Sequence, residues 1–297
     1  MPSSSSLKAD FTLLLVTLLA AAGWIFSKEA LVQMPPLTFI AMRFFSSGVI
    51  LALFDLQALA GMSGNALKKA ALSGVCFAVA MLCWISGLSH SENLGVGAFL
   101  TSLGVVMVPL MSLLFGDRPG RSSWLALPFA VAGLVSLSLD SAFEFGLAEW
   151  MFLTAAVLFA LVFILTSRAA AVVPAVPLSS IQLMTVGLIV GPLALMTESW
   201  QAVELDIWWW VLASILIATC LRFFLQVWAQ GRTSASKAAM IMVLEPVWTA
   251  VLAVLWFNES MTLVQVIGCS LIFFSLVVGR LGAVARLLRA VRTPVQG

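Results

Sequence analysis

The chain of 297 residues contains no tyrosine, a single histidine and few charges, since Asp, Glu, Lys and Arg make up 9% of it. A soluble domain carries roughly 25% charged residues, so this composition excludes a globular surface that faces water. One histidine and four cysteines without a CxxC pair argue against a metal site. The sequence also lacks a Walker loop, an HExxH helix and a GxSxG motif. We expect no catalytic residues, no cofactor and no nucleic-acid partner.

Because tyrosine is absent, tryptophan must supply the aromatic belts that anchor helices at membrane surfaces. Five tryptophans are predicted to lie at one surface of the membrane: Trp150, Trp200, Trp208, Trp209 and Trp210.

Long apolar runs dominate the rest of the sequence, which is 62% hydrophobic and has a mean hydropathy of +1.11. A helix needs ~20 apolar residues to cross a bilayer. Charges, prolines and Ser/Gly clusters divide the chain into ten such windows: 10–32, 37–60, 66–88, 93–116, 121–140, 146–170, 177–198, 206–230, 234–257 and 261–284. The predicted fold class is an all-α integral membrane protein with ten transmembrane helices.

The chain also repeats itself. Residues 87–137 align without a gap with residues 142 positions later, so that His90 falls on Arg232 and Asp117 on Glu259 (232−90 = 259−117 = 142). We divide the chain into a first repeat (1–142), a second repeat (143–285) and a basic cytoplasmic tail (286–297). Five helices in each repeat place the second repeat upside down relative to the first, as in many secondary transporters.

Charge placement predicts the orientation, because basic residues favour the cytoplasmic side. One set of connections and ends holds Lys8, Lys68, Lys69, Arg118, Arg121, Arg168, Arg232, Lys237, Arg286, Arg289 and Arg292. The opposite connections hold Glu29, Glu92, Asp140, Glu144, Glu198, Glu204, Asp206 and Glu259. We expect a multi-pass protein of a bacterial inner membrane, with both termini cytoplasmic and the basic tail near lipid headgroups.

Two charges lie deep inside predicted helices, where each costs at least ~2.5–3.5 kcal/mol on insertion scales. Glu245 lies ten residues beyond Ala235, and Arg222 lies seven residues before Ala229. On antiparallel neighbouring helices their depths would differ by ~4.5 Å, which allows an ion pair. The pair would be either a structural contact or part of a transport site.

Proline follows Glu245 directly. Pro246 cannot donate to the carbonyl one turn earlier, which predicts a polar break beside the carboxylate. Gly104 is the repeat equivalent of Pro246. Pro109 lies five residues beyond Gly104 and predicts a second break in the first repeat. Broken helices at related places in two repeats are typical of a binding site at the membrane midplane.

Other residues within the spans complete a candidate substrate cavity. Arg43 lies more than a turn inside its helix and is expected to face the bundle, while Glu245 and Trp248 share a helix face. The candidate cavity residues are Trp24, Lys28, Arg43, Trp84, Phe99, Phe163, Arg222, Gln226, Met240, Glu245 and Trp248. Aromatic walls with few charges suit an amphipathic metabolite better than a sugar phosphate, which would need clustered Lys and Arg.

A set of landmarks occurs in order along the chain: Trp24 to Lys28, Pro35-Pro36, Arg43, Gly116-Asp117, Trp124, Gly133, Thr233-Ser234-Ala235, Leu244-Glu245-Pro246, Asn258-Glu259 and Gly268. Together these landmarks resemble the drug/metabolite transporter superfamily, specifically its EamA-type permeases, and are similar to the aromatic amino-acid exporter branch. The resemblance implies ten helices in two repeats and export of amino acids or related metabolites through a cavity between them. Leu103 is the first-repeat counterpart of Glu245, so a carboxylate role is confined to one repeat.

The sequence therefore predicts a secondary transporter that exports amino acids, including aromatic and other apolar ones, by alternating access. Its partners would be the small-molecule substrate and membrane lipids. A permease for drugs, nucleosides or other cations, with Glu245 binding the cation or a coupling proton, stays open. A membrane enzyme acting on lipids or a scaffold is the remaining class, which flux through purified protein in liposomes would distinguish.

Overall fold

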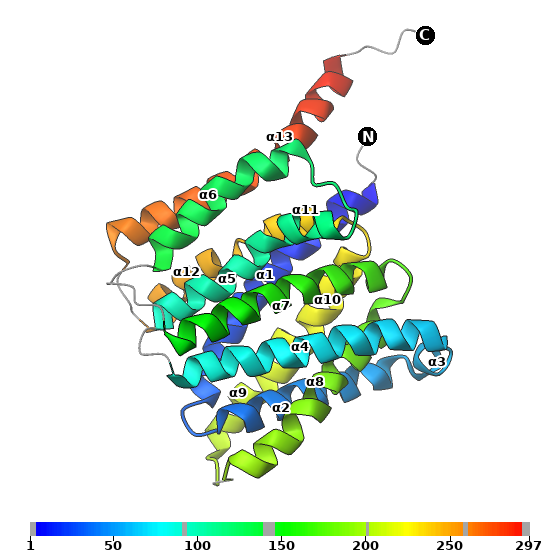
Figure 1. Ribbon diagram of the computed structural model, residues 1–297, viewed down its shortest axis with the longest axis vertical. Coiled ribbons are helices and arrows are strands. Elements are labelled where there is room, and N and C mark those ends of the chain that lie inside the picture. The colour runs from blue at the N-terminus through cyan, green and yellow to red at the C-terminus, as the bar shows by residue number, and fades with distance from the viewer. Residues whose placement is uncertain (1–3, 91–93, 139–145, 200–201, 258–260, 293–297) are drawn as a thin grey trace.

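The computed structural model describes residues 4–90, 94–138, 146–199, 202–257 and 261–292, and every regular element in these ranges is a helix (Figure 1). The elements are α1 (Ser4–Ala30), α2 (Pro36–Phe54), α3 (Leu56–Ala60), α4 (Gly64–His90), α5 (Leu94–Leu114), α6 (Arg121–Ser138), α7 (Leu147–Ala170), α8 (Ala175–Thr197), α9 (Leu205–Ile215), the π-helix η1 (Leu216–Leu221), α10 (Arg222–Gln230), α11 (Ala235–Met242), α12 (Glu245–Phe257) and α13 (Leu263–Arg292).

The helical membrane class predicted from the sequence is confirmed. Seven helices or helix series in the described ranges are long and apolar enough to cross a bilayer, and shorter apolar stretches occupy Leu100–Phe115 and Leu263–Gly279. Large apolar side chains cover the outside of the bundle; Leu114 is 83% and Leu195 87% exposed. Such a surface would be unfavourable in water and suits lipid. The count of ten spans remains a prediction.

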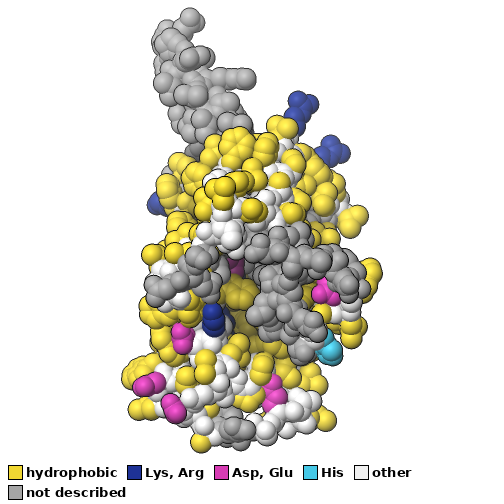
Figure 2. All heavy atoms as spheres, turned by 90° about the vertical axis from the view of Figure 1, so that its left-hand side faces the viewer, with side chains coloured by type: hydrophobic (Ala, Val, Ile, Leu, Met, Phe, Trp, Pro, Cys, Tyr) yellow, Lys and Arg dark blue, Asp and Glu magenta, His cyan; other side chains and the backbone are white. Residues whose placement is uncertain are grey.

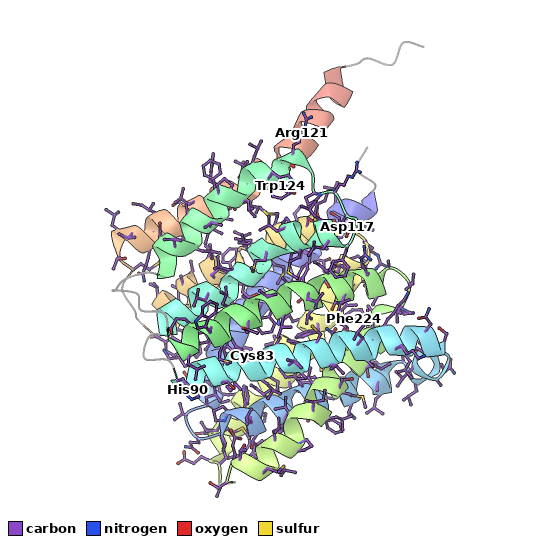
Figure 3. The ribbon with its side chains drawn as sticks, in the orientation of Figure 1. Cys83, His90, Asp117, Arg121, Trp124 and Phe224 are labelled. Carbon is purple, nitrogen blue, oxygen red and sulfur yellow. The ribbon has the colours of Figure 1, made fainter. Side chains whose placement is uncertain are left out.

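Residues that the charge pattern assigns to one side of the membrane lie at one end of the bundle. The start of α1 and the end of α13 lie toward the same end (Figure 1). Asp117 and Arg121 lie at that end too, whereas His90 lies at the opposite end (Figure 3). Four of the acidic residues assigned to the outer connections, Glu92, Asp140, Glu144 and Glu259, fall outside the described residues, as does Trp200. Trp150 and Trp209 are 58% and 66% exposed, as membrane anchors would be.

α2 packs closely against α8 along one side of the bundle (Figure 1). A Cβ added at Gly48 would lie 2.5 Å from Cγ of Met184, and one added at Gly187 would lie 2.5 Å from Cβ of Phe45. Glycine at both positions lets the two backbones approach, as small residues do between membrane helices. The contacts run antiparallel and are reciprocal, because Gly48 and Gly187 are each three positions from the residue that the other touches.

Further helix pairs make up the rest of the bundle (Figure 1). α6 packs along α13, α4 and α5 pack on α7, and α1 packs on the series α9–η1–α10 and on α11 and α12. A Cβ added at Gly133 of α6 would lie 2.8 Å from the Gly268 carbonyl oxygen. One added at Gly104 of α5 would lie 2.7 Å from the Ala156 carbonyl oxygen, so both glycines allow close backbone contact. Each of these pairs joins elements from before and after residue 142, so the two predicted repeats are interleaved in space.

Several boundaries differ from the sequence-based prediction. Pro109 was expected to break its helix, and this is wrong: α5 continues through it to Leu114. Pro128 and Pro192 also lie inside continuous helices, so a proline alone does not interrupt a helix in this bundle. The window 37–60 divides at Asp55, whose side chain accepts a hydrogen bond from the Ala58 amide and caps α3. α13 continues to Arg292, into the predicted tail.

Glu198, after the last turn of α8, caps the start of α2. Its carboxylate accepts hydrogen bonds from the amides of Leu37 (2.8 Å) and Thr38 (2.7 Å) and from the Thr38 hydroxyl (2.8 Å). We expect Glu198→Ala to lower the free energy of unfolding by about 1–2 kcal/mol, because two helix N-terminal amides lose their acceptor. Thermal unfolding in detergent measures this. Glu204→Ala is the matched control, since Glu204 precedes α9 without a side-chain cap bond; equal shifts for both variants would contradict the capping role.

Candidate functional site

The predicted break beside Glu245 is present. α11 ends at Met242, two non-helical residues follow, and α12 begins at Glu245. Pro246 stands second in α12, where a missing amide donor costs little. The carboxylate of Glu245 is thereby placed at the amino-terminal end of a half-helix inside the bundle, where the helix dipole stabilises negative charge.

A second irregular segment places Arg222. The span from Leu205 to Gln230 is helical throughout, but residues 216–221 form a π-helix. Within it the Thr219 hydroxyl donates to the Ser214 carbonyl five residues earlier (2.8 Å). Arg222 follows directly as the first residue of α10. Single π-helical turns are rare and occur frequently at functional sites, because the extra residue changes the direction of the side chains that follow.

The expected ion pair between these two residues is confirmed. Nη2 of Arg222 lies 3.7 Å from Oε2 of Glu245, and the side chains are 20% and 24% exposed. A strong charge-assisted N–H···O bond is about 2.7–2.9 Å long, so this contact is loose. Both side chains of the pair are mostly buried but remain partly accessible. A ligand inserted between Arg222 and Glu245 would not have to break a short hydrogen bond.

Two tryptophan side chains lie beside the Glu245 carboxylate, one in contact with it and the second in contact with the first. Nε1 of Trp24 on α1 donates to Oε1 of Glu245 at 3.4 Å. The Trp24 ring meets Trp84 of α4 edge to face, with centroids 6.1 Å apart and planes at 74°. Trp24 is 42% exposed and Trp84 is half-buried. The result is an aromatic wall beside a pair of opposite charges.

Gln226 lies one turn after Arg222 on α10 and adds an amide side chain to the same face of that helix. Among the described residues, neither Nε of Arg222 nor Oε1 of Gln226 has a hydrogen-bond partner, although both atoms are buried. Buried polar atoms normally find a partner, and each exception calls for an explanation. A donor and an acceptor on one helix face, next to an opposite-charge pair, suit a ligand with several polar groups.

Arg43 faces the bundle, as expected, but it contacts protein groups. Its Nε donates to the Thr219 hydroxyl (2.6 Å), Nη1 to the Ser27 hydroxyl (3.0 Å) and Nη2 to the Ala218 carbonyl (3.3 Å). These contacts join α2 to α1 and to the π-helix. The guanidinium is thus engaged on all three nitrogens.

The remaining candidates lie further from the pair. Lys28 is exposed near the end of α1, with Nζ 3.8 Å from the centroid of the Phe257 ring. Phe163 and Met240 are 9% and 5% exposed and belong to packed apolar clusters. Trp248, three positions after Glu245, is 36% exposed. The side chain of Phe99 lies outside the described residues.

Sequence reasoning missed the residues that hold these side chains in place. Ser27 and Thr219 bind Arg43, but both are single small polar residues in apolar runs, which gives little signal. Gln182 was also missed. It is 1% exposed and donates to Ser73 and Thr166, both at 3.1 Å. An amide in the middle of an apolar window was the available signal, since buried polar groups in membranes need partners.

Two cavities lie elsewhere in the bundle. One, of about 410 Å³, lies between α3, α4 and α8, and the other, of about 420 Å³, lies beside α10 and is lined by Asp55, Trp228 and Arg232 among others. Neither includes Arg222 or Glu245, so the chemistry of the pair, not cavity volume, defines the candidate site. Within the described ranges, no three His, Cys, Asp or Glu side chains are grouped closely enough to hold a metal ion.

Figure 2 views the end of the bundle where the histidine lies. Acidic side chains are spread over the lower half of this face, around one basic side chain near its centre. Apolar side chains form the floor of a recess next to that basic side chain. The charge pattern assigns this end to the outer side of the membrane, and that orientation remains a prediction.

Comparison with known proteins places these features in a family. The model of the EamA-like transporter family matches the chain twice, over residues 7–139 and 146–279. An uncharacterized transporter of Archaeoglobus fulgidus is 28% identical over 273 residues, which cover 92% of this chain and 85% of that protein. A second uncharacterized transporter of the same organism is 24% identical over 184 residues, 62% of this chain and 66% of that protein.

A solved crystal structure shares the fold. It superposes with a TM-score of 0.78 and covers 99% of this chain and 100% of its own, at 17% sequence identity. At this identity the likeness shows the fold alone.

Proposed function

Because this chain belongs to the EamA-like transporter family, and is a multi-pass membrane protein, we propose that the Arg222–Glu245 pair is the substrate site of a secondary transporter that exports amino acids. The observation that carries this proposal is the loose pair of opposite charges, 3.7 Å apart and partly exposed, at the junction of a π-helix and an interrupted helix. An amino acid carries the complementary pair of charges.

The chemistry of binding follows from this arrangement. The substrate carboxylate binds Arg222, whose Nε and Nη groups can donate two parallel hydrogen bonds. The substrate ammonium binds Glu245. An aromatic or other apolar side chain packs against Trp24 and Trp84. Arg43 is not assigned to the substrate, because its nitrogens already bind Ser27, Ala218 and Thr219.

The wider architecture of the proposal has ten spans in two inverted repeats, 1–142 and 143–285, with the segment 286–297 as a basic tail. The double family match and the reciprocal glycine contacts of α2 and α8 support it. In this arrangement both termini are cytoplasmic, the membrane is the bacterial inner membrane, and the site is exposed alternately to the two sides.

The direct test is counterflow in liposomes containing the purified protein. Vesicles loaded with one unlabelled amino acid should accumulate a labelled amino acid from outside, with aromatic and large apolar substrates moved fastest. If no amino acid moves while another metabolite does, the substrate assignment is wrong. Chemically unchanged substrate on both sides also separates transport from enzymatic turnover.

Analogues that lack one charge sharpen this test. We expect an arylalkylamine without the carboxylate, and an arylalkanoic acid without the ammonium, each to compete at least about tenfold more weakly than the amino acid, since each leaves one site charge unpaired. Competition with labelled substrate measures this.

The alternative, a permease for drugs, nucleosides or other cations coupled to protons, predicts the opposite order. The amine would then compete as well as the amino acid, and transport would depend on pH and membrane potential. The structure supports it less, because Arg222 already neutralises Glu245.

A further inference from the structure

The bundle contains two sets of three polar side chains that each tie three helices together. The charged triad comprises Ser27, Arg43 and Thr219, and the neutral triad comprises Ser73, Thr166 and Gln182. In the charged triad a guanidinium donates to two hydroxyls. In the neutral triad the Gln182 amide does the same, and the two hydroxyls also bind each other at 2.9 Å.

Two of the three members of each triad occupy equivalent places, whereas the third members, Ser73 and Thr219, are related by a different shift (219−73 = 146). The shift from Ser27 to Thr166 equals the shift from Arg43 to Gln182 (166−27 = 182−43 = 139), and the shift between the contact glycines 48 and 187 is the same (187−48 = 139). Arg43 and Gln182 each lie seven positions after the first residue of their helix (43−36 = 182−175 = 7), and α2 and α8 begin at opposite ends of the bundle (Figure 1). Arg43 and Gln182 therefore lie toward opposite ends of the bundle.

The neutral triad shows what packing alone requires. Ser73, Thr166 and Gln182 are 0%, 3% and 1% exposed, and Ser73 belongs to α4, which is α-helical throughout. An amide with two hydroxyl partners is thus sufficient to join three helices. A guanidinium in a membrane costs more than an amide, so joining helices does not explain Arg43.

The charged triad differs in what it holds. Its third member, Thr219, lies in the π-helix three positions before Arg222, and Ser27 lies three positions after Trp24. Arg43 also donates to the Ala218 carbonyl within the π-helix, a contact for which the neutral triad has no counterpart among the described hydrogen bonds. Arg43 thus connects the two elements whose side chains meet Glu245.

We propose that Arg43 is a positioning residue for transport: it fixes the π-helical turn against α1 and so aims Arg222 and Trp24 at Glu245. This inference rests on the proposed function, because it takes the Arg222–Glu245 pair as the substrate site. Gln182 holds the equivalent place in the other repeat without such a task.

A matched pair of substitutions tests the proposal. Thr219→Val removes the acceptor of Arg43 Nε, and Thr166→Val removes one acceptor of Gln182, with the side-chain shape kept in both. Removing a hydrogen bond to a charged group changes an equilibrium by about tenfold or more. We expect Thr219→Val to lower kcat/KM for counterflow by that factor, mainly through KM, while Thr166→Val stays within about twofold of wild type.

Hydrogen–deuterium exchange supplies a readout that does not depend on transport. Amides of residues 216–222 should exchange faster in Thr219→Val, and faster still in Arg43→Gln, which puts the residue of the neutral triad at this position. Arg43→Gln should fold, since an amide suffices in the neutral triad. Relative to Arg43→Gln, Arg43→Lys should restore transport and exchange protection together and only in part, because an ammonium keeps the charge but lacks the planar fork.

The outcomes separate the two proposals. Equal transport losses in Thr219→Val and Thr166→Val, or unchanged exchange at residues 216–222 in Arg43→Gln, would overturn the positioning role. If wild-type protein moves no amino acid, or if Arg222→Gln transports normally, the proposed substrate site fails instead. The exchange comparison then still decides whether Arg43 holds the π-helix.

Discussion

Glu245→Gln is expected to leave a folded protein whose transport is lowered at least about thirtyfold, the factor that corresponds to ~2 kcal/mol for the loss of one partner of a shielded charge pair. The amide keeps the shape of the carboxylate and can still accept from Trp24 and Arg222. It cannot neutralise a substrate ammonium. Initial rates of counterflow, normalised to folded protein, measure the effect.

The structural alternative gives a different pattern. If the pair only joins two helices, Glu245→Gln leaves Arg222 without its counter-charge, and breaking a fully buried pair costs ~3–5 kcal/mol. Folded yield would then fall and recover when Arg222→Gln is added. Because both side chains are partly exposed, we expect the cost in stability to be smaller than that. A stable Glu245→Gln protein with full transport would contradict both roles.

Gly187→Ala is expected to lower the stability of the protein. The new Cβ would lie 2.5 Å from Cβ and 2.8 Å from Cα of Phe45, so α8 and α2 must move apart. Overpacking of this kind typically costs ~1–3 kcal/mol. The melting temperature in detergent should fall, and the yield of monodisperse protein should fall with it.

Gly191→Ala, one turn further along α8, is the matched control. The nearest atom to its added Cβ is Cβ of Ala41 at 4.0 Å, which is an ordinary contact. Alanine also favours a helix over glycine by about 1 kcal/mol. We therefore expect an unchanged or slightly raised melting temperature. Equal destabilisation by both substitutions would show that the close approach of α2 and α8 does not limit stability.

Most helix limits follow from the sequence, because the apolar windows end where charges and turn residues begin. The window 146–170, for example, corresponds to α7 at Leu147–Ala170. The ion pair followed from helix depth alone, since Arg222 and Glu245 lie at similar distances from one connection. Both inferences use only length, apolarity and antiparallel order, which tertiary packing does not change.

Other features depend on tertiary contacts. The π-helix adds one residue to a helical turn without changing the amino-acid composition. It is held by a hydrogen bond from Arg43 of α2, far away in sequence, to its own residue Thr219. Pro109 was misjudged for a similar reason, because packing of α5 on α7 keeps that helix continuous. Local sequence specifies neither the π-helix nor the continuity of α5, because Arg43 and the packing residues of α7 lie far from these segments in the sequence.

The Arg43 contacts also set a condition on synthesis in the cell. Thr219 and Ala218 follow Arg43 by 176 and 175 residues. At roughly 5–20 residues per second, α2 waits about 10–35 seconds for them after it emerges from the ribosome. During that interval its guanidinium stands in or beside the bilayer with only Ser27 of α1 available. The apolar residues of the remainder of α2 must therefore retain the helix in the membrane until the second half of the chain arrives.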